Sequence, residues 1–205
     1  KLEKGIEYAT SDPKRWDSEK GLVKRGYTID TWDFTYMPDA GINRRIEDGV
    51  TPMAIMHGDN SGVWQAMNQL AWMNRRLGNE TKALEWEGRA SKLRSDIFKH
   101  LWNGRHFVHQ KPLNVPPYDD KEDIRLSLSN TYDINRGLTD LWQSRSIIEE
   151  YLSRRDTSSA FAEWFTIDPP YDKFFIYKPG KYVNGAISPF TAGELAKAAF
   201  NNGYE

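Results

Sequence analysis

The sequence contains no cysteine, which excludes disulfides, thiolate metal ligands and cysteine nucleophiles. It also lacks an excess of charge of one sign, since 28 Lys and Arg residues stand against 29 Asp and Glu residues. Such a balance gives no electrostatic footprint for nucleic acid or a membrane surface. No apolar run approaches the roughly 20 residues that a membrane-spanning helix needs. We therefore expect neither nucleic acid nor a membrane as a partner.

Aromatic residues, in contrast, make up 13% of the 205 residues and include eight Trp and ten Tyr. Trp and Tyr combine a flat apolar face with a polar tip, which suits stacking on sugar rings. Most of them, roughly two-thirds, are expected to fill the core instead, as Trp and Tyr usually do. The length suits one domain, 1–205, with a real core. The compartment stays open, with a periplasmic or secreted location favoured over the cytoplasm.

A helical hairpin is predicted over residues 61–102, where apolar residues recur at helical spacing. Asp59–Ser61 is a cluster of N-cap residue types, and Gly78 supplies a stop between the two helices. The very short turn makes the helices antiparallel. Residues 1–60 carry turn signals around short apolar runs and predict loops, short strands or single helical turns.

The rest of the chain alternates loops with helices. The pattern predicts a short strand over 105–109, a loop over 111–124, an ambiguous helix over 126–138, a helix over 139–154, an extended stretch over 161–167 and a helix from Ser188-Pro189 onwards. In the 139–154 helix, the side chains expected to face inward are Leu141, Ile148, Tyr151 and Leu152.

Helix pairs separated by long, aromatic-rich, acidic loops predict an all-α fold. We expect an (α/α)6 toroid of helical hairpins, as a partial barrel, with long loops and short strands at one rim. In such a toroid the loops at the rim build the site while the helices hold it. The sequence shows no βαβ alternation and no Gly-rich phosphate loop.

The first candidate for chemistry is Asp33, which stands between Trp32 and Phe34. Aromatic surface penalises the charged carboxylate, so such a carboxyl can stay protonated and act as a general acid. Trp32 and Asp30 are expected to contact the sugar. On spacing alone, an ordinary turn aspartate beside two packed rings is the commoner case.

Two further segments carry candidate sugar ligands. In the first, one of Asp59, Asn60 and Ser61 caps a helix, while the others and Trp64 are expected at the ligand.

In the second segment, Glu163 beside Trp164 is a candidate second catalytic carboxylate, and Asn184 is a candidate sugar ligand. An exposed glutamate at a strand edge is an equally good interpretation of Glu163.

No metal or cofactor is expected. His106 and His109 lie three residues apart on a predicted strand and would point to opposite faces. The acidic residues of 119–123 lack EF-hand spacing, so we interpret them as a solvated loop and not as a calcium site.

At these segments the chain resembles the six-hairpin (α/α)6-barrel glycosidases, especially their trehalase-like and glucosidase-I-like members. The run from Thr31 to Tyr36 is similar to the Gly-Trp-Asp-Phe-Ser segment of that group. Asp59-Asn60 with the hairpin, then Glu163-Trp164, then Asn184-Gly185 and Ser188-Pro189 resemble later segments of the group in the same order.

The resemblance implies hydrolysis with inversion, using one acid, one base and a water between carboxyls roughly 6.5–9.5 Å apart. It implies that Asp33 is the acid, whereas the base of the family falls beyond Glu205, so Glu163 is only a substitute. A full barrel needs twelve helices against about five here, which indicates a fragment, or a further stretch of the enzyme that completes the ring.

We therefore expect a glycoside hydrolase that acts on an oligosaccharide. A phosphorylase or lyase on the same fold is one alternative. A non-catalytic carbohydrate-binding helical module is another, and it predicts sugar binding without turnover.

Overall fold

The structure, a computed structural model, describes residues 1–26, 47–172 and 177–204. This part of the chain is mostly helical, as predicted, with a few short antiparallel strands. Its helices are α1 Leu2–Ala9, α2 His57–Arg76, α3 Glu80–Leu101, α4 Ser129–Asn135, α5 Leu141–Ser153 and α6 Pro189–Asn201, with a 3-10 turn, η1, at Glu122–Ile124. Its strands are β1 Trp16–Asp17, β2 Leu22–Val23, β3 Arg25–Gly26, β4 Met53–Met56, β5 Gln110–Pro112, β6 Leu126–Ser127 and β7 Ile167–Asp168.

The predicted hairpin is confirmed as α2 and α3, whose facing sides bury the apolar stripe. Gly78 joins the helices with φ +78°, a conformation that glycine adopts without strain. The start of α2 differs from the prediction. Residues 59–61 lie inside its first turn rather than capping it, because β4 runs directly into the helix and extended Met56 is the N-cap.

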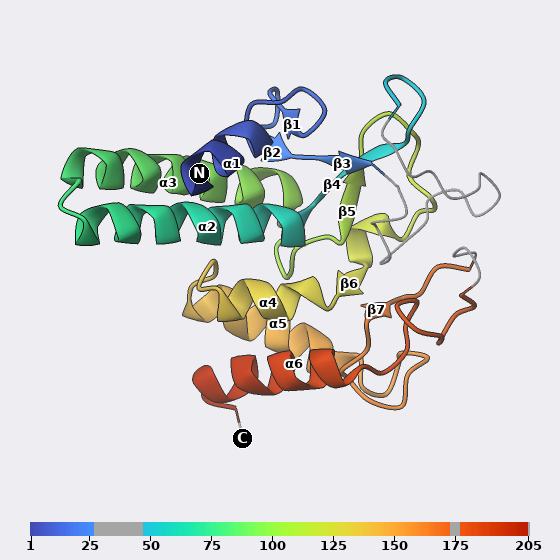
Figure 1. Cartoon of the computed structure of the whole chain (residues 1–205). Helices are drawn as coiled ribbons and strands as arrows, with labels where there is room; N and C mark the ends of the chain where they lie inside the picture. Colours follow the sequence, from blue (N-terminus) through green and yellow to red (C-terminus); the bar gives the residue numbers. More distant parts are fainter. Residues whose placement is uncertain (27–46, 173–176, 205) are drawn as a thin grey trace.

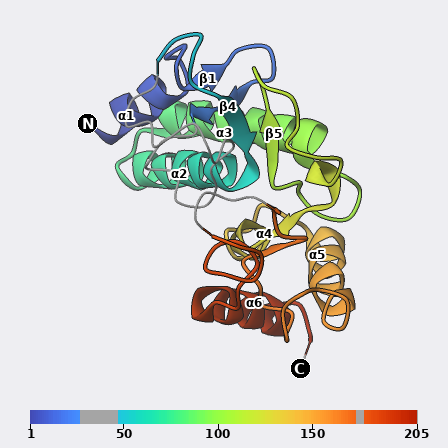
Figure 2. The ribbon, with the colours of Figure 1, turned by 90° about the vertical axis from the view of Figure 1, so that its right-hand side faces the viewer.

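Below the hairpin, α4, α5 and α6 form a second helical group (Figures 1 and 2). Asp140 caps α5 in a capping box with Gln143, so the helix begins at residue 141. The inward prediction for Leu141 and Leu152 was wrong, since both are exposed. The buried stripe instead runs through Ser144, Ile147, Ile148 and Tyr151, at helical spacing. The predicted start of α6 at Ser188-Pro189 is confirmed.

Short antiparallel ladders flank each helical group. Strands β3, β4 and β5 form one sheet in that order, and β6 pairs with β7. The strand predicted at 105–109 is not formed: β5 begins at Gln110, and Phe107 only bridges Trp102. Likewise, the stretch predicted over 161–167 reduces to the start of β7 and a Phe165–Ile187 bridge. The N-terminal α1 is longer than the single turn expected.

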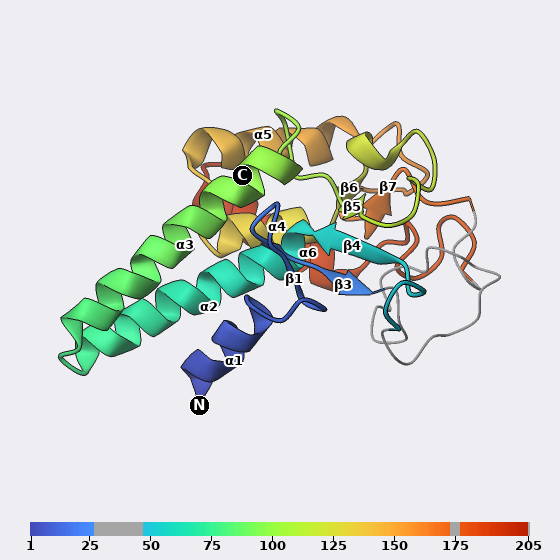
Figure 3. The ribbon, with the colours of Figure 1, turned by 90° about the horizontal axis from the view of Figure 1, so that it is seen from above.

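The helices extend to one side of the molecule, and the strands and long loops gather at the other (Figures 1 and 3). One continuous apolar core fills the space between the hairpin and the lower helices, and includes Leu70, Trp86, Leu93, Ile147 and Leu195. None of the helices in the described residues is both long and apolar enough to span a membrane.

Replacement of Leu93 by alanine should destabilise the protein by about 2–5 kcal/mol, because Leu93 is fully packed between the hairpin helices. Leu84→Ala in the same helix is the matched control, since Leu84 is 58% exposed, and should change stability by no more than about 0.5 kcal/mol. Urea denaturation followed by circular dichroism measures both. Equal losses in the two variants would contradict the packing described here.

Candidate functional site

The candidate site forms where two strands run directly into helices. Strand β4 leads into α2 at His57, and β6 leads into α4 at Ser129. These junctions meet at Gly58, where an added Cβ would lie only 2.8 Å from the Ser129 hydroxyl oxygen. Only glycine permits this approach, so the two junctions can share one wall of a cavity.

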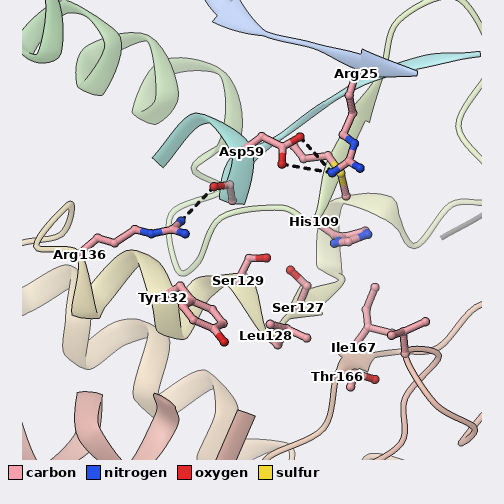
Figure 4. Close-up of a pocket in the computed structure, with 13 residues that line it drawn as sticks. Arg25, Asp59, His109, Ser127, Leu128, Ser129, Tyr132, Arg136, Thr166 and Ile167 are labelled. Carbon is pink, nitrogen blue, oxygen red and sulfur yellow. Dashed lines mark hydrogen bonds and ion pairs between the residues drawn. The ribbon is translucent and has the colours of Figure 1, made fainter. Parts of the chain in front are cut away.

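The cavity has a volume of about 230 Å³. Figure 4 shows side chains that converge on it from both junctions and from the loop before β7. Its lining consists of Arg25, Met56, Gly58, Asp59, His109, Ser127, Leu128, Ser129, Tyr132, Arg136, Thr166, Ile167 and Val183. A small cavity with hydroxyl, carboxylate and guanidinium groups suits a polar ligand.

The charged groups of the cavity are held in place by other groups of the chain. Nη1 of Arg25 lies 3.2 Å from one oxygen of Asp59 and 3.3 Å from the other. Nη1 of Arg136 donates to the Gly58 carbonyl at 3.0 Å and to the Ser61 hydroxyl at 2.6 Å. Because these bonds fix the side chains before any ligand arrives, little entropy is lost when a ligand binds.

Behind the lining, His57 and Asp133 form a fully buried pair. Nδ1 of His57 lies 2.6 Å from Oδ2 of Asp133, and Nε2 lies 3.1 Å from the hydroxyl oxygen of Ser127. The imidazole stacks on Phe107, with ring centroids 5.7 Å apart. Nη1 of Arg136 lies 3.8 Å from the other oxygen of Asp133. The pair therefore connects the cavity wall to the core.

The two asparagines predicted to bind sugar use their amides within the chain. Asn60 accepts from the Val23 amide at 2.7 Å and donates to the carbonyls of Val23 and Met56. Asn184 accepts from the Tyr171 amide at 2.8 Å and donates to the carbonyls of Tyr171 and Tyr177. Both side chains are fully buried and brace backbone around the cavity rather than line it.

The other predicted site residues fall in three places. Asp59 lines the cavity. Trp64 and Trp164 are half-buried against the core and are not part of the lining. Asp30, Trp32 and Asp33 lie outside the described residues.

Glu163 lies outside the cavity lining and is bound by Arg155 through two bonds, at 2.6 and 3.0 Å. The guanidinium lowers the pKa of this carboxyl below its ordinary value.

Sequence patterns missed most of the cavity. Arg25, Ser127, Tyr132 and Arg136 stand in no motif, and the pairing of His57 with Asp133 spans 76 residues. His57 did stand in the segment 57–64 that was singled out for Asp59 and Asn60. The strand on which His106 and His109 were predicted to point to opposite faces is not formed, and both side chains are buried.

A second buried polar cluster lies beside the cavity, centred on the fully buried guanidinium of Arg125. It pairs with Asp119 and with Glu122, and stacks over the Tyr171 ring at 3.7 Å from the centroid. The Tyr171 hydroxyl donates to Glu122 at 3.2 Å, and the Tyr171 ring lies near that of His109 in the cavity wall. Burial raises the pKa of Glu122 to about 7, although Arg125 opposes the shift.

This shift predicts a pH dependence of folding. Between the ordinary pKa and about 7, the folded protein binds the Glu122 proton and the unfolded chain does not, so the contribution to stability falls as pH rises. The change should approach about 3 kcal/mol between pH 4.5 and 8. Urea denaturation of wild type and Glu122→Gln at both pH values isolates it, because other titrating groups cancel in the difference. Parallel curves for the two proteins would refute the shift.

Comparison with solved structures finds proteins that share the fold of this chain. The arrangement of the whole chain is that of part of a solved glycosidase structure, described as "Sialidase". The superposition has a TM-score of 0.64 at 19% sequence identity and covers 100% of this chain and 18% of that chain. The chain thus spans less than a fifth of that protein, and the likeness shows a shared fold. No protein-family model matches the chain, and no curated protein matches its sequence.

Proposed function

We propose that this chain is part of the catalytic domain of a glycoside hydrolase that cleaves O-glycosidic bonds of an oligosaccharide. The observation that carries the proposal is the preorganised polar cavity at the two strand-to-helix junctions. The shared fold with a structure described as a sialidase, which is a glycosidase, adds support. So does the resemblance of the sequence motifs to six-hairpin glycosidases.

The proposed architecture is a partial (α/α)6 toroid. The antiparallel hairpin α2–α3 and the lower group α4–α6 lie side by side, with their loops on one side (Figure 1). Such placement of loops is what a rim-built active site requires. The rest of the enzyme would complete the ring around the cavity, since the comparison structure is much longer than this chain.

The proposed chemistry is inversion by an acid and a base. Asp33 protonates the leaving oxygen, and Asp30 and Trp32 contact the sugar beside it. Asp59 accepts hydrogen bonds from sugar hydroxyls in the cavity, where its pairing with Arg25 keeps the carboxylate in one orientation. The lining hydroxyl of Tyr132 and the guanidinium of Arg136 supply donors to the same ligand.

Asp33→Asn should lower kcat by roughly 10²–10⁴-fold, the range for removal of a general acid. The assay measures sugar release from a panel of p-nitrophenyl α- and β-glycosides and oligosaccharides by the intact enzyme. Asp48→Asn is the control, since the Asp48 carboxylate is 75% exposed and pairs only with Lys14 among the described residues. Near-wild-type turnover by Asp33→Asn removes Asp33 as the acid. Sugar binding without turnover in the wild type favours a binding module.

Glu163→Gln tests the second carboxylate. We expect turnover within about threefold of wild type, because Arg155 holds Glu163 outside the cavity lining. Steady-state kinetics on the best substrate of the panel measure the change. A loss as large as that of Asp33→Asn would identify Glu163 as the base.

A further inference from the structure

The chain Asp133–His57–Ser127 links the core to the cavity through two hydrogen bonds, of 2.6 and 3.1 Å. Asp133 and His57 are fully buried, and the Ser127 side chain stands in the cavity lining (Figure 4). Oδ1 of Asp133 has no hydrogen-bond partner among the described residues. Burial of an incompletely bonded carboxylate costs several kcal/mol, so apolar packing would serve stability better here. This cost points to a role at the cavity.

The bonding limits where each hydrogen lies. A carboxylate only accepts, so Nδ1 of His57 carries the hydrogen that faces Asp133. With the imidazole taken as neutral, Nε2 is an acceptor and the Ser127 hydroxyl donates to it. With its only hydrogen used, Ser127 can offer lone pairs but no donor to the cavity. Arg136, 3.8 Å from Oδ1, supplies the positive charge that balances Asp133.

The three groups have the order and the spacing of a serine hydrolase triad. The accessibility of the histidine distinguishes a catalytic triad from a chain that only orients the serine. A triad histidine passes its proton to a leaving group in the cavity, but His57 is 0% exposed, stacks on Phe107 and is absent from the lining. The imidazole therefore reaches only Ser127 from behind, where it can orient the hydroxyl and has no path to a departing atom.

We propose that Ser127 is a specificity-determining hydrogen-bond acceptor for one hydroxyl of a sugar in the cavity, held in that role by the positioning residues His57 and Asp133. The identity of the ligand as a sugar rests on the proposed function. Among the lining groups, Arg136 and Tyr132 can donate, so an oriented acceptor in the same cavity complements a ring that both donates and accepts. A ligand lacking that hydroxyl leaves Ser127 without its partner in a buried place, which costs affinity.

The orientation is tested without any ligand, by long-range ¹H–¹⁵N NMR of the histidine rings. We expect the Nδ1–H tautomer of His57 in the wild type and in Ser127→Ala, because Asp133 sets it. The Nε2–H tautomer, or a ring protonated at both nitrogens, overturns the orientation.

The acceptor role is tested by NMR titration with the methyl glycosides of glucose, galactose and mannose, and with their monodeoxy analogues. Ser127→Ala should weaken binding of the best sugar about tenfold, and Ser146→Ala on the surface of α5 should not weaken it. Removal of one particular hydroxyl should weaken wild-type binding similarly and have no further effect on Ser127→Ala.

The outcomes distinguish this inference from the proposed function. If the wild type binds a sugar and Ser127→Ala binds it equally well, only the inference fails. If no sugar binds the wild type, the proposed function fails, and so does the assignment of the ligand as a sugar. The NMR result on the tautomer is unaffected. Hydrolysis of p-nitrophenyl acetate that disappears in Ser127→Ala would show a nucleophilic serine and overturn the orienting role.

Discussion

The cavity depends on the contact between Gly58 and Ser129, where the first turns of two helices meet almost backbone to hydroxyl. Any larger residue at position 58 would push β4–α2 and β6–α4 apart. The hydrogen bond from Arg136 to the Gly58 carbonyl also links the chain that follows α4 to the start of α2. Positions of Asp59, Ser127 and Tyr132 all follow from this one approach, because each stands within a few residues of the junctions.

Around that contact the protein concentrates the charged groups that it buries. Arg125 with Asp119 and Glu122 lies on one side, and His57 with Asp133 on the other. Among the described residues the buried Asp, Glu and Arg side chains, Glu122, Arg125 and Asp133, all belong to these two clusters, whereas uncharged polar side chains such as Thr191 are also buried elsewhere. Buried charges seldom add stability compared with apolar packing, so their gathering at one cavity indicates that shape and polarity of the cavity have been kept at the expense of stability.

The helices could be predicted where the signals were local. Spacing of apolar residues with Gly78 gave the hairpin, and Ser188-Pro189 gave the start of α6. Local signals failed where tertiary structure determined the bounds of a helix. Because β4 runs directly into α2, that helix begins before Asp59. In α5, the capping box of Asp140 places Leu141 at an exposed first position.

The candidate site could be predicted only in part for the same reason. Asp59 stood in a recognisable segment, but its partner Arg25 lies 34 residues away, and His57 meets Asp133 across 76. The spacing of residues along the sequence does not predict pairings over such distances. Asn60 and Asn184 show the opposite error. Their neighbours in sequence suggested a sugar site, but in the structure both side-chain amides are hydrogen-bonded to the backbone.

The difference in sequence separation has a consequence for how the molecule assembles. Contacts within the α2–α3 hairpin close across one tight turn, so little chain entropy opposes them, and this unit can form early. The cavity joins residues from both halves of the chain and forms only when the lower helices dock. A molecule in which the lower helices have not docked would thus have no binding surface, and ligand would bind only molecules in which docking is complete.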